Sequence, residues 1–311
     1  MIQFAPPTWA TEGADVDLFI ARLIDGLNNG VIYGFLALAL VCVYRGTGYL
    51  NLAQGEMAMF CAFLAYSFVG WGLPVVAAIV VVVLIGAAGG AVAERVLVRP
   101  LGRHAEYSVL LVTIGIFLAL NTGAGVIWGG NPLDFPTVVP NGPNDYISIA
   151  GSRLHYQQIT ILVILLAVLG LLFYLFRFTK LGLAMRTVAG NPDAARLLGI
   201  PVNRINSLGW VMAAAVGALL GPLVAPGTTL TTGMMFNFLI YATAAAALGG
   251  FDSPGGAVLS GILIGIVENL VASYVSFVGP SLKQCVALVV LVVVLVARPT
   301  GLFGTKRVER V

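Results

Sequence analysis

Charged side chains are scarce in this sequence. Its 311 residues include 13 Asp and Glu and 16 Lys and Arg, so 9% of the chain is charged, whereas soluble domains carry about 25%. The hydrophobic fraction is 59% and the mean hydropathy is +0.99. Soluble globular and disordered chains both need much more polar surface than this, so both classes are excluded. The composition indicates a protein that resides in a lipid bilayer.

Cysteine and histidine are also few. Cys42, Cys61 and Cys285 lie inside apolar runs, without the spacing of a metal site, and free cysteine packs as a small hydrophobic residue. The histidines, His104 and His155, belong to different loops and complete no metal site with them. We therefore expect neither a metal ion nor a disulfide framework.

Motifs for nucleotide binding and catalysis are absent from the sequence. A P-loop needs Gly directly before its Lys, but the three lysines follow Thr179, Leu282 and Thr305. There is no HExxH sequence and no Ser, His and Asp set that the spans bring together. The basic loops are too short for a nucleic-acid surface. These absences predict a transporter, channel or structural membrane subunit that is not an enzyme and binds no cofactor itself.

Long apolar runs dominate the remaining sequence. Runs such as Val75–Gly86 and Cys285–Ala297 lack the alternation of a barrel strand, so we predict an all-α polytopic membrane protein. Because one span needs roughly 20 apolar residues, the length accommodates about nine spans, within roughly eight to ten. The predicted spans are 20–44, 52–70, 73–94, 107–128, 157–177, 207–226, 236–250, 256–278 and 281–298. The segment 236–250 is short and rich in Ala, so it either crosses the membrane or forms a re-entrant half-helix.

Basic residues are distributed unevenly between these spans. Most of them fall in three segments: Arg95, Arg99 and Arg103; Arg177, Lys180, Arg186, Arg196 and Arg204; and Arg298, Lys306, Arg307 and Arg310. The positive-inside rule makes these segments cytoplasmic, including the loop 178–206 and the tail 299–311. The acidic N-terminal segment 1–19 and the loop 129–156 are predicted outside. The first span, which lacks a preceding basic region, is expected to act as an uncleaved insertion signal.

The extracytoplasmic loop 129–156 contains one segment with the pattern of β-strands. Residues Tyr146–Tyr156 alternate around Gly151-Ser152 and predict a hairpin, which is either a solvated cap or a docking surface for an extracytoplasmic partner.

Glycines four residues apart predict close helix contacts. They are Gly26, Gly30 and Gly34; Gly86 and Gly90; Gly217 and Gly221; Gly261 and Gly265.

Polar residues at membrane depth are candidates for the translocation path. Asn51, Gln54 and Glu56 gather at the start of the second span, where Gly55 predicts an unwound or re-entrant turn. In the span 256–278 lie Glu268 and Asn269. An unpaired charge at this depth costs about 2.5–3.5 kcal/mol even on the milder insertion scale. These groups therefore clamp helices together, line a path or stay protonated.

A sharp backbone turn is predicted at Leu248–Gly256. Gly249, Gly250 and Pro254 permit such a turn, which is either structural or a pore constriction. No internal sequence repeat is evident, and this weakens, without excluding, a secondary transporter built from inverted repeats.

The loop 178–206 contains a predicted short helix outside the membrane, over 192–198. Asn191 suits the N-cap, Pro192 the first position and Asp193 the positive end of the helix dipole. Gly199 then ends the helix. Its apolar residues, with Arg196 at the edge, are Ala194, Ala195, Leu197 and Leu198. The helix either rests on lipid headgroups or inserts into a groove of a cytoplasmic partner.

Four motifs resemble the permeases of bacterial branched-chain amino-acid ABC transporters. Asp193-Ala-Ala-x3-Gly199 is similar to the Glu-Ala-Ala-x3-Gly loop of ABC importer permeases, with Asp in place of Glu, and lies within a longer matching run from Met185. The other matching segments are Asn51–Met57, Leu248–Gly256 and Pro299–Gly304. The resemblance covers roughly residues 20–304, and the chain length is closest to the LivH-type subunit.

The resemblance implies a multi-pass subunit of the bacterial inner membrane that translocates branched-chain or similar aliphatic amino acids. It implies a LivM-like second permease, two cytoplasmic ATPases that bind ATP and Mg, and a periplasmic substrate-binding protein. The implied ATPase-coupling residues are Asn191 and Asp193, Ala194, Ala195, Arg196, Leu197, Leu198 and Gly199. The candidates for the translocation path or a helix clamp are Asn51, Gln54, Glu56, Gly249, Gly250, Glu268 and Asn269. The alternative is a self-sufficient ion-coupled amino-acid carrier that uses Glu56 and Glu268.

Overall fold

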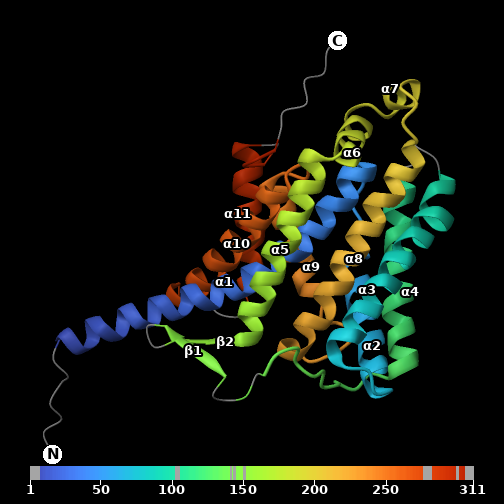
Figure 1. Cartoon of the computed structure of the whole chain (residues 1–311). Coiled ribbons are helices and arrows are strands. Elements are labelled where there is room, and N and C mark those ends of the chain that lie inside the picture. Colours follow the sequence, from blue (N-terminus) through green and yellow to red (C-terminus); the bar gives the residue numbers. More distant parts are fainter. Residues whose placement is uncertain are drawn as a thin grey trace, which may run out of the picture.

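A computed structural model shows a bundle of helices with one small hairpin at its edge (Figure 1). It describes residues 8–101, 106–140, 142, 145–149, 152–275, 282–298 and 301–304. The α-helices are α1 Thr8–Thr47, α2 Gln54–Gly70, α3 Val75–Val92, α4 Glu106–Trp128, α5 Tyr156–Phe178, α6 Lys180–Gly190, α7 Pro192–Leu197, α8 Val202–Thr228, α9 Phe236–Gly249, α10 Pro254–Tyr274 and α11 Lys283–Ala297. A π-helix, η1 Ala93–Val98, and a 3-10 turn, η2 Arg99–Leu101, extend α3.

Each predicted span coincides with a helix, namely α1–α5 and α8–α11. Six of these helices are long and apolar enough to cross a membrane, whereas α9 and α11 are shorter apolar helices and α2 has 17 residues. The all-α polytopic class is therefore confirmed, and the number of crossings stays a prediction. Helix α1 begins at Thr8, inside the predicted N-terminal segment 1–19. A helix can begin before the apolar run that predicts its membrane span.

The predicted hairpin is present as β1 Tyr146–Ile149 and β2 Ser152–His155, with Tyr146 opposite His155. Its tip at Gly151 lies outside the described residues. The same holds for Arg103, His104 and the basic tail residues Lys306, Arg307 and Arg310. We call the edge of the molecule that holds β1 and β2 the hairpin end. The opposite edge, where α7 protrudes, is called the α7 end (Figure 1).

Two helices begin inside the bundle. An unwound segment, 48–53, precedes α2 as expected from the sequence, and Gln54 Nε2 donates to Ala213 O in mid-α8 at 2.8 Å. A second unwound segment, 229–235, folds back from the end of α8 to the start of α9. The two helix starts meet, because a Cβ on Gly55 would lie 3.4 Å from Met235 O. The bundle therefore contains two helices, α2 and α9, that each start after an unwound segment and whose first turns are in contact.

The helices α1–α4 and α8–α11 pack in matching pairs. Helix α1 packs on α10 as α8 packs on α3, α2 on α8 as α9 on α1, and α4 on α2 as α11 on α9. The end of α1 lies at the start of α8, since a Cβ on Gly46 would lie 3.0 Å from Gly209 Cα, so the halves run in opposite directions. This is an inverted structural repeat. The repeat lies in helix order and packing, and it leaves no evident repeat in the sequence.

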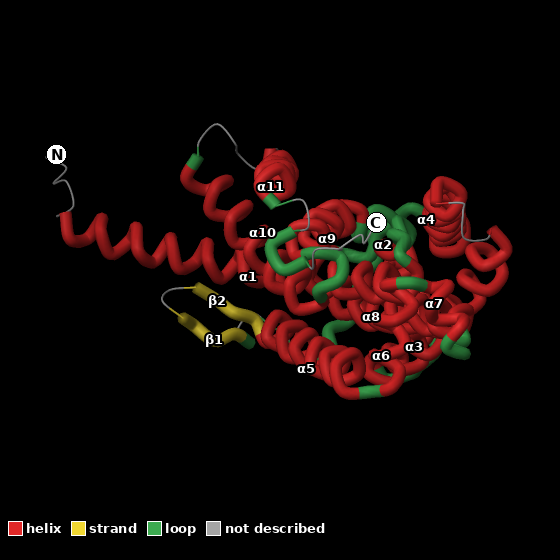
Figure 2. Tube along the Cα trace, turned by 90° about the horizontal axis from the view of Figure 1, so that it is seen from above, coloured by secondary structure: helices red, strands yellow, loops and turns green. Residues whose placement is uncertain are grey.

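Glycines bring the central helices close together, as the four-residue spacing predicts. A Cβ on Gly30 would lie 2.6 Å from Ile262 Cα in α10. A Cβ on Gly86 or Gly90 of α3 would lie 2.6 Å from a methyl group of α8. Seen along the bundle, α4, α5 and α11 lie at the periphery around α2, α8 and α9 (Figure 2).

Candidate coupling and translocation site

Helix α7 has the limits that its local sequence predicts. The Asn191 side chain accepts hydrogen bonds from the backbone N–H groups of Asp193 and Ala194, both at 3.0 Å. Gly199 has a φ of +76°, which glycine adopts without strain. The N–H of Ile200 then donates to Ala195 O at 3.0 Å, which closes the helix end. The helix is Pro192–Leu197, with Leu198 as its C-cap.

The apolar residues of α7 divide between two faces. Ala195 is fully buried against this chain, whereas Leu197 is 90% exposed and Leu198 is 73% exposed. Within this chain the methyl group of Ala195 is therefore already covered, and the coupling role of the α7 residues stays a prediction. The surface available to a partner is formed by Leu197 and Leu198, at the tip of the α7 end (Figure 1).

The loop 178–206 also contains helix α6, which the sequence analysis missed. Gly182, Met185 and Val188 are buried, and their three-residue spacing places them on one face. Thr179 caps this helix by accepting a hydrogen bond from Gly182 N at 3.2 Å. The spacing and the cap are the signals that identify α6. Because α6 packs on α7, α1 and α8, it attaches α7 to the bundle.

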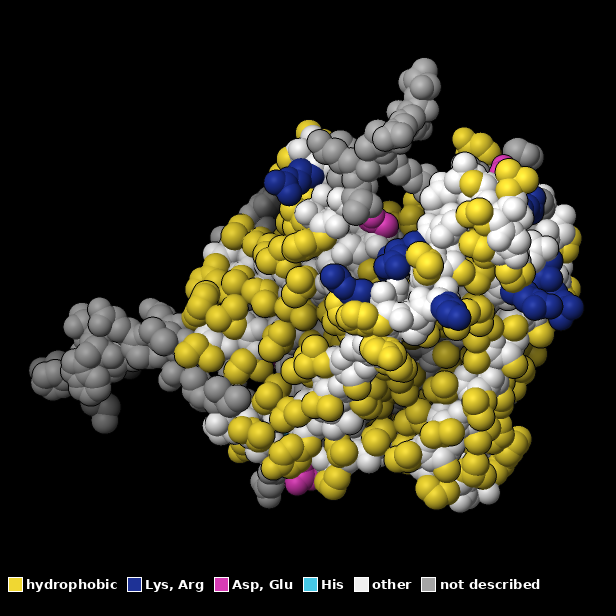
Figure 3. Space-filling model, turned by 45° about the horizontal axis from the view of Figure 1, so that its top comes forward, with side chains coloured by type: hydrophobic (Ala, Val, Ile, Leu, Met, Phe, Trp, Pro, Cys, Tyr) yellow, Lys and Arg dark blue, Asp and Glu magenta, His cyan; other side chains and the backbone are white. Residues whose placement is uncertain are grey.

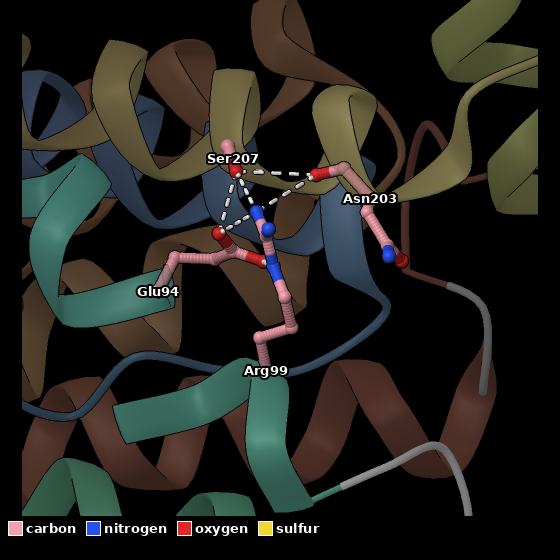
Figure 4. A network of polar contacts seen from close by, with 4 residues as sticks. All are labelled: Glu94, Arg99, Asn203 and Ser207. Atoms are coloured by element: carbon pink, nitrogen blue, oxygen red, sulfur yellow. Dashed lines mark hydrogen bonds and ion pairs between the residues drawn. The ribbon is translucent and has the colours of Figure 1, made fainter. Parts of the chain in front are cut away.

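A network of polar contacts joins η1 to the first turns of α8 (Figure 4). Arg99 binds both carboxylate oxygens of Glu94, with Nη2 to Oε2 at 2.7 Å and Nε to Oε1 at 3.2 Å. Ser207 donates to Glu94 Oε2 at 2.5 Å and accepts from Arg99 at 2.7 Å. We call these three residues the Glu94 clamp. Sequence reasoning used Arg99 only for orientation and missed Glu94, although this acidic residue stands at the end of a long apolar run.

The opposite side of α8 is fixed to α1. The amide of Asn206, oriented to donate, bonds Gly46 O at 2.6 Å. Gly209 packs directly against Gly46. The start of α8 therefore contacts the end of α1 as well as Glu94 of η1 and Arg99 of η2, only a few residues after α7.

The polar residues at the start of the second predicted span are buried, as expected for side chains at membrane depth: Asn51, Gln54 and Glu56. Asn51 Nδ2 donates to Gln54 Oε1 at 3.2 Å, and Asn51 Oδ1 accepts from Ala53 N at 3.0 Å. These bonds brace the first unwound segment. Glu56 instead reaches α4, where its Oε2 accepts from Asn121 Nδ2 at 3.1 Å. The sequence analysis did not single out Asn121.

Glu268 and Asn269 belong to a different cluster, which links α10 to α1 and α11. Tyr33 donates to both carboxylate oxygens of Glu268, at 3.2 and 3.3 Å. Asn269 donates to Arg22 O at 3.2 Å and accepts from Lys283 Nζ at 3.1 Å. The structure thus connects Glu268 and Asn269 to neighbouring helices and does not bring them together with Glu56. Whether they clamp helices or take part in translocation stays a prediction.

Gly249 and Gly250 form the sharp turn that the sequence predicts after α9. Gly250 has a φ of +92°. A Cβ there would lie 2.6 Å from Gly304 Cα, and Leu302 N donates to Leu248 O at 2.7 Å. The closing segment 301–304 therefore packs on this turn. A role as a pore constriction stays a prediction.

The candidate residues offer hydrogen bonds and apolar contacts rather than a metal centre. Within the described residues, no three His, Cys, Asp or Glu side chains are grouped to hold a metal ion. The polar side chains also come from separate elements: α7, η1 with α8, α2 with α4, and α10 with α1. This arrangement suits the transmission of movement between helices.

Comparisons with known proteins identify the family. The profile of the family described as "Branched-chain amino acid transport system / permease component" matches residues 22–295. The permease protein BraD of the high-affinity branched-chain amino acid transport system of Pseudomonas aeruginosa is 32% identical over 94% of this chain and 98% of its own. The corresponding LivH of Escherichia coli K12 is 29% identical over the same shares. The chain PsaBC from Streptococcus pneumoniae, solved in complex with Fab, aligns with a TM-score of 0.47 and 15% identity over 91% of this chain and 94% of its own. From the profile match and these relatives, the chain belongs to the permease components of branched-chain amino acid transport systems.

Proposed function

We propose that this chain is the membrane-spanning subunit of an ABC importer that moves branched-chain or similar aliphatic amino acids across the bacterial inner membrane. ATP is hydrolysed on separate subunits, which hold ATP and Mg, and this chain converts their closure into access from alternate sides. The family match favours this reading over the ion-coupled carrier. The observation that carries it is α7, a capped short helix that exposes two leucines at one end of the bundle.

The proposed orientation places the α7 end in the cytoplasm. Basic side chains gather around this end, whereas the sides of the bundle are covered by hydrophobic side chains (Figure 3). The positive-inside rule assigns such an end to the cytoplasm. The N-terminus and the hairpin end then lie outside and the C-terminal tail inside, with about nine crossings.

The proposed partners follow from the surfaces that remain exposed. Leu197 and Leu198 fit an apolar groove on a cytoplasmic ATPase, of which the importer has two. The peripheral helices, α4 and α11, expose apolar sides to lipid and to a second, LivM-like permease. The hairpin end faces the periplasmic substrate-binding protein, and either acts as a solvated cap or contacts that protein.

The first test removes the exposed leucines. Leu197→Asp with Leu198→Asp should abolish co-purification of the ATPases and ATP hydrolysis stimulated by the loaded binding protein, because a charge cannot enter an apolar groove without a partner. Leu183→Asp on α6, which replaces another exposed leucine (58%), is the matched control. Wild-type coupling in the double variant would show that α7 only rests on the membrane surface.

The second test addresses the ion-coupled alternative. In proteoliposomes that contain this chain alone, a proton or sodium gradient should drive no uptake of leucine, because the ATPases supply the energy. Robust gradient-driven uptake by the lone chain would reject the importer assignment.

A further inference from the structure

A groove of about 400 Å³ opens on the side of the bundle between α4, α9 and α11. Its walls include Leu52, Ile114, Phe117, Phe236, Ile240 and Leu288. Among the described residues that line it, Thr243 alone has a polar side chain, and its hydroxyl already donates to Leu239 O at 2.7 Å. The groove therefore offers apolar contacts, in a volume within the usual range for small-molecule sites, roughly 300–1,000 Å³.

The groove adjoins a polar cluster that is formed by three segments: the start of α2, helix α4 and the unwound segment before α9. Glu56 follows Leu52, Asn121 lies one turn beyond Phe117 in α4, and the second unwound segment precedes Phe236. Asn121 Nδ2 donates both to Glu56 Oε2 at 3.1 Å and to Thr232 O at 2.9 Å. The carboxylate of Glu56 thus belongs to a residue four positions after the groove-lining Leu52, where the starts of α2 and α9 meet.

The carboxylate of Glu56 is incompletely satisfied. The side chain is 1% exposed, and within the described part of the chain its one hydrogen-bond donor is the neutral amide of Asn121. A buried carboxylate is stabilised when a cation and further donors surround it. Ionisable groups inside membrane proteins generally mark a path or a ligand. A hydrocarbon chain or an apolar helix in this groove would require no carboxylate at its end.

We propose that the groove and Glu56 form an intramembrane binding subsite for a zwitterionic aliphatic amino acid on its way through the importer. This inference rests on the proposed function. The aliphatic side chain of the substrate lies against Phe117, Phe236 and Leu288. Its ammonium group replaces the Asn121 amide at Glu56, and its carboxylate points to the open side of the groove, toward the second permease and not toward lipid, where an unpaired charge would be costly. The opening of the Asn121 bond then couples arrival of the substrate to release of α4 from α2.

Photo-crosslinking locates the substrate directly. The probe is a leucine analogue with a diazirine on its side chain, supplied through the binding protein to the assembled importer in proteoliposomes with ATP. Adducts are expected on Phe236, Ile240 or Leu288, and excess leucine should suppress them. Glu56→Gln should lower the adduct yield about tenfold, which corresponds to about 1.4 kcal/mol, because the ammonium group loses its charged acceptor. Glu56→Asp, which keeps the charge, should retain more of the yield.

The outcomes separate this inference from the proposed function. If the wild-type assembly takes up no leucine, the proposed function fails, and the subsite fails with it. If it takes up leucine but carries no adduct in the groove, the subsite alone is wrong.

A matched pair of variants in α11 tests the apolar walls. Leu288→Trp narrows the groove, whereas Val289→Trp places the same ring on a neighbouring position that is 61% exposed and does not line the groove. Leu288→Trp should reduce uptake of leucine more than uptake of valine, and Val289→Trp should change neither. Equal effects of the two variants, in assemblies that co-purify intact, would show that lipid or the second permease occupies the groove.

Discussion

Helices α8 and α4 are both long and apolar enough to cross a membrane, but they sit in opposite surroundings. In α8, 72% of the most apolar stretch is buried within the chain, whereas in α4 the share is 11%. Helix α8 contacts α1, α2 and α3 extensively, through small residues such as Ala214 and Gly217. Helix α4 is attached to the bundle by a few side chains, chiefly Asn121 and Trp128.

This difference assigns separate mechanical roles to the two helices. Backbones that touch cannot slide without a clash, because protein interiors are close-packed, so we expect α8 to move as a rigid body. Helix α4 can change its position when two or three hydrogen bonds open, because few of its side chains are interlocked. The groove beside α4 is therefore the part of the bundle best able to change shape.

The largest expected effect comes from crowding α8. A Cβ on Gly221 would overlap Ala58 O, whereas a Cβ on Gly123 of α4 would meet nothing within 4 Å. Gly221→Ala should therefore destabilise the protein by about 1–3 kcal/mol, and Gly123→Ala should be neutral or stabilising by up to about 1 kcal/mol. Thermal unfolding of the two purified variants in detergent measures the contrast. Equal melting temperatures would remove the distinction between the helices.

An effect on stability of similar size is expected at the Glu94 clamp, which fixes the start of α8. Glu94→Gln leaves the Arg99 guanidinium beside a neutral amide. Removing one partner of a buried pair costs about 3–5 kcal/mol, but Arg99 is 32% exposed, so we expect about 1–3 kcal/mol. ATP hydrolysis stimulated by the binding protein should fall more than basal hydrolysis.

Arg95→Gln is the matched control for the clamp, because Arg95 lies in the same π-helix and is exposed. Full stimulation in Glu94→Gln would show that the clamp stabilises the fold without transmitting movement. A Ser207→Ala variant should have the same direction of effect and a smaller size, since it removes a hydroxyl and no charge.

The smallest effect is expected where α4 meets α2. Trp128 Nε1 donates to Ser67 Oγ at 2.7 Å, and its ring packs 5.1 Å from that of Phe63. Trp128→Phe keeps the aromatic contact and loses one hydrogen bond, so it should cost about 0.5–1.5 kcal/mol. Ser67→Ala should cost a similar amount, and the double variant should cost little more than either single variant. If the losses of stability in the two single variants add up in the double variant, the hydrogen bond between Trp128 and Ser67 does not hold α4 against α2.

The sequence predicted features that depend on neighbouring residues. The spans follow from runs of apolar residues, and the limits of α7 follow from Asn191, Pro192 and Gly199, because the hydrogen bonds that cap the two ends join groups close together in the sequence. The turn at Gly250 was likewise predictable because its backbone conformation suits glycine. In each case the physical cause lies within a few residues of its effect.

Other features were not predictable because their partners are distant in the sequence. Glu94 acquires a structural role only when Ser207, 113 residues away, lies beside it. Asn121 is one amide in an apolar run until Glu56 and Thr232 approach it. The burial of Ala195 depends on its tertiary contacts, so the local pattern could not separate it from Leu197. The inverted repeat likewise requires the packing of whole helices.

The π-helix η1 has a consequence for how this chain tolerates changes in length. Glu94 and Arg99 are five residues apart, and in an α-helix such residues point about 140° away from each other. The i→i+5 hydrogen bonding of a π-helix brings them nearly into line, and this is why Arg99 reaches the carboxylate. The extra residue in this turn therefore acts as a register spacer. Deleting one residue between 94 and 99 would leave the pair four residues apart, a spacing that a regular α-helical turn keeps on one face, so we expect the deletion to remove the π-turn and preserve the contact between Glu94 and Arg99.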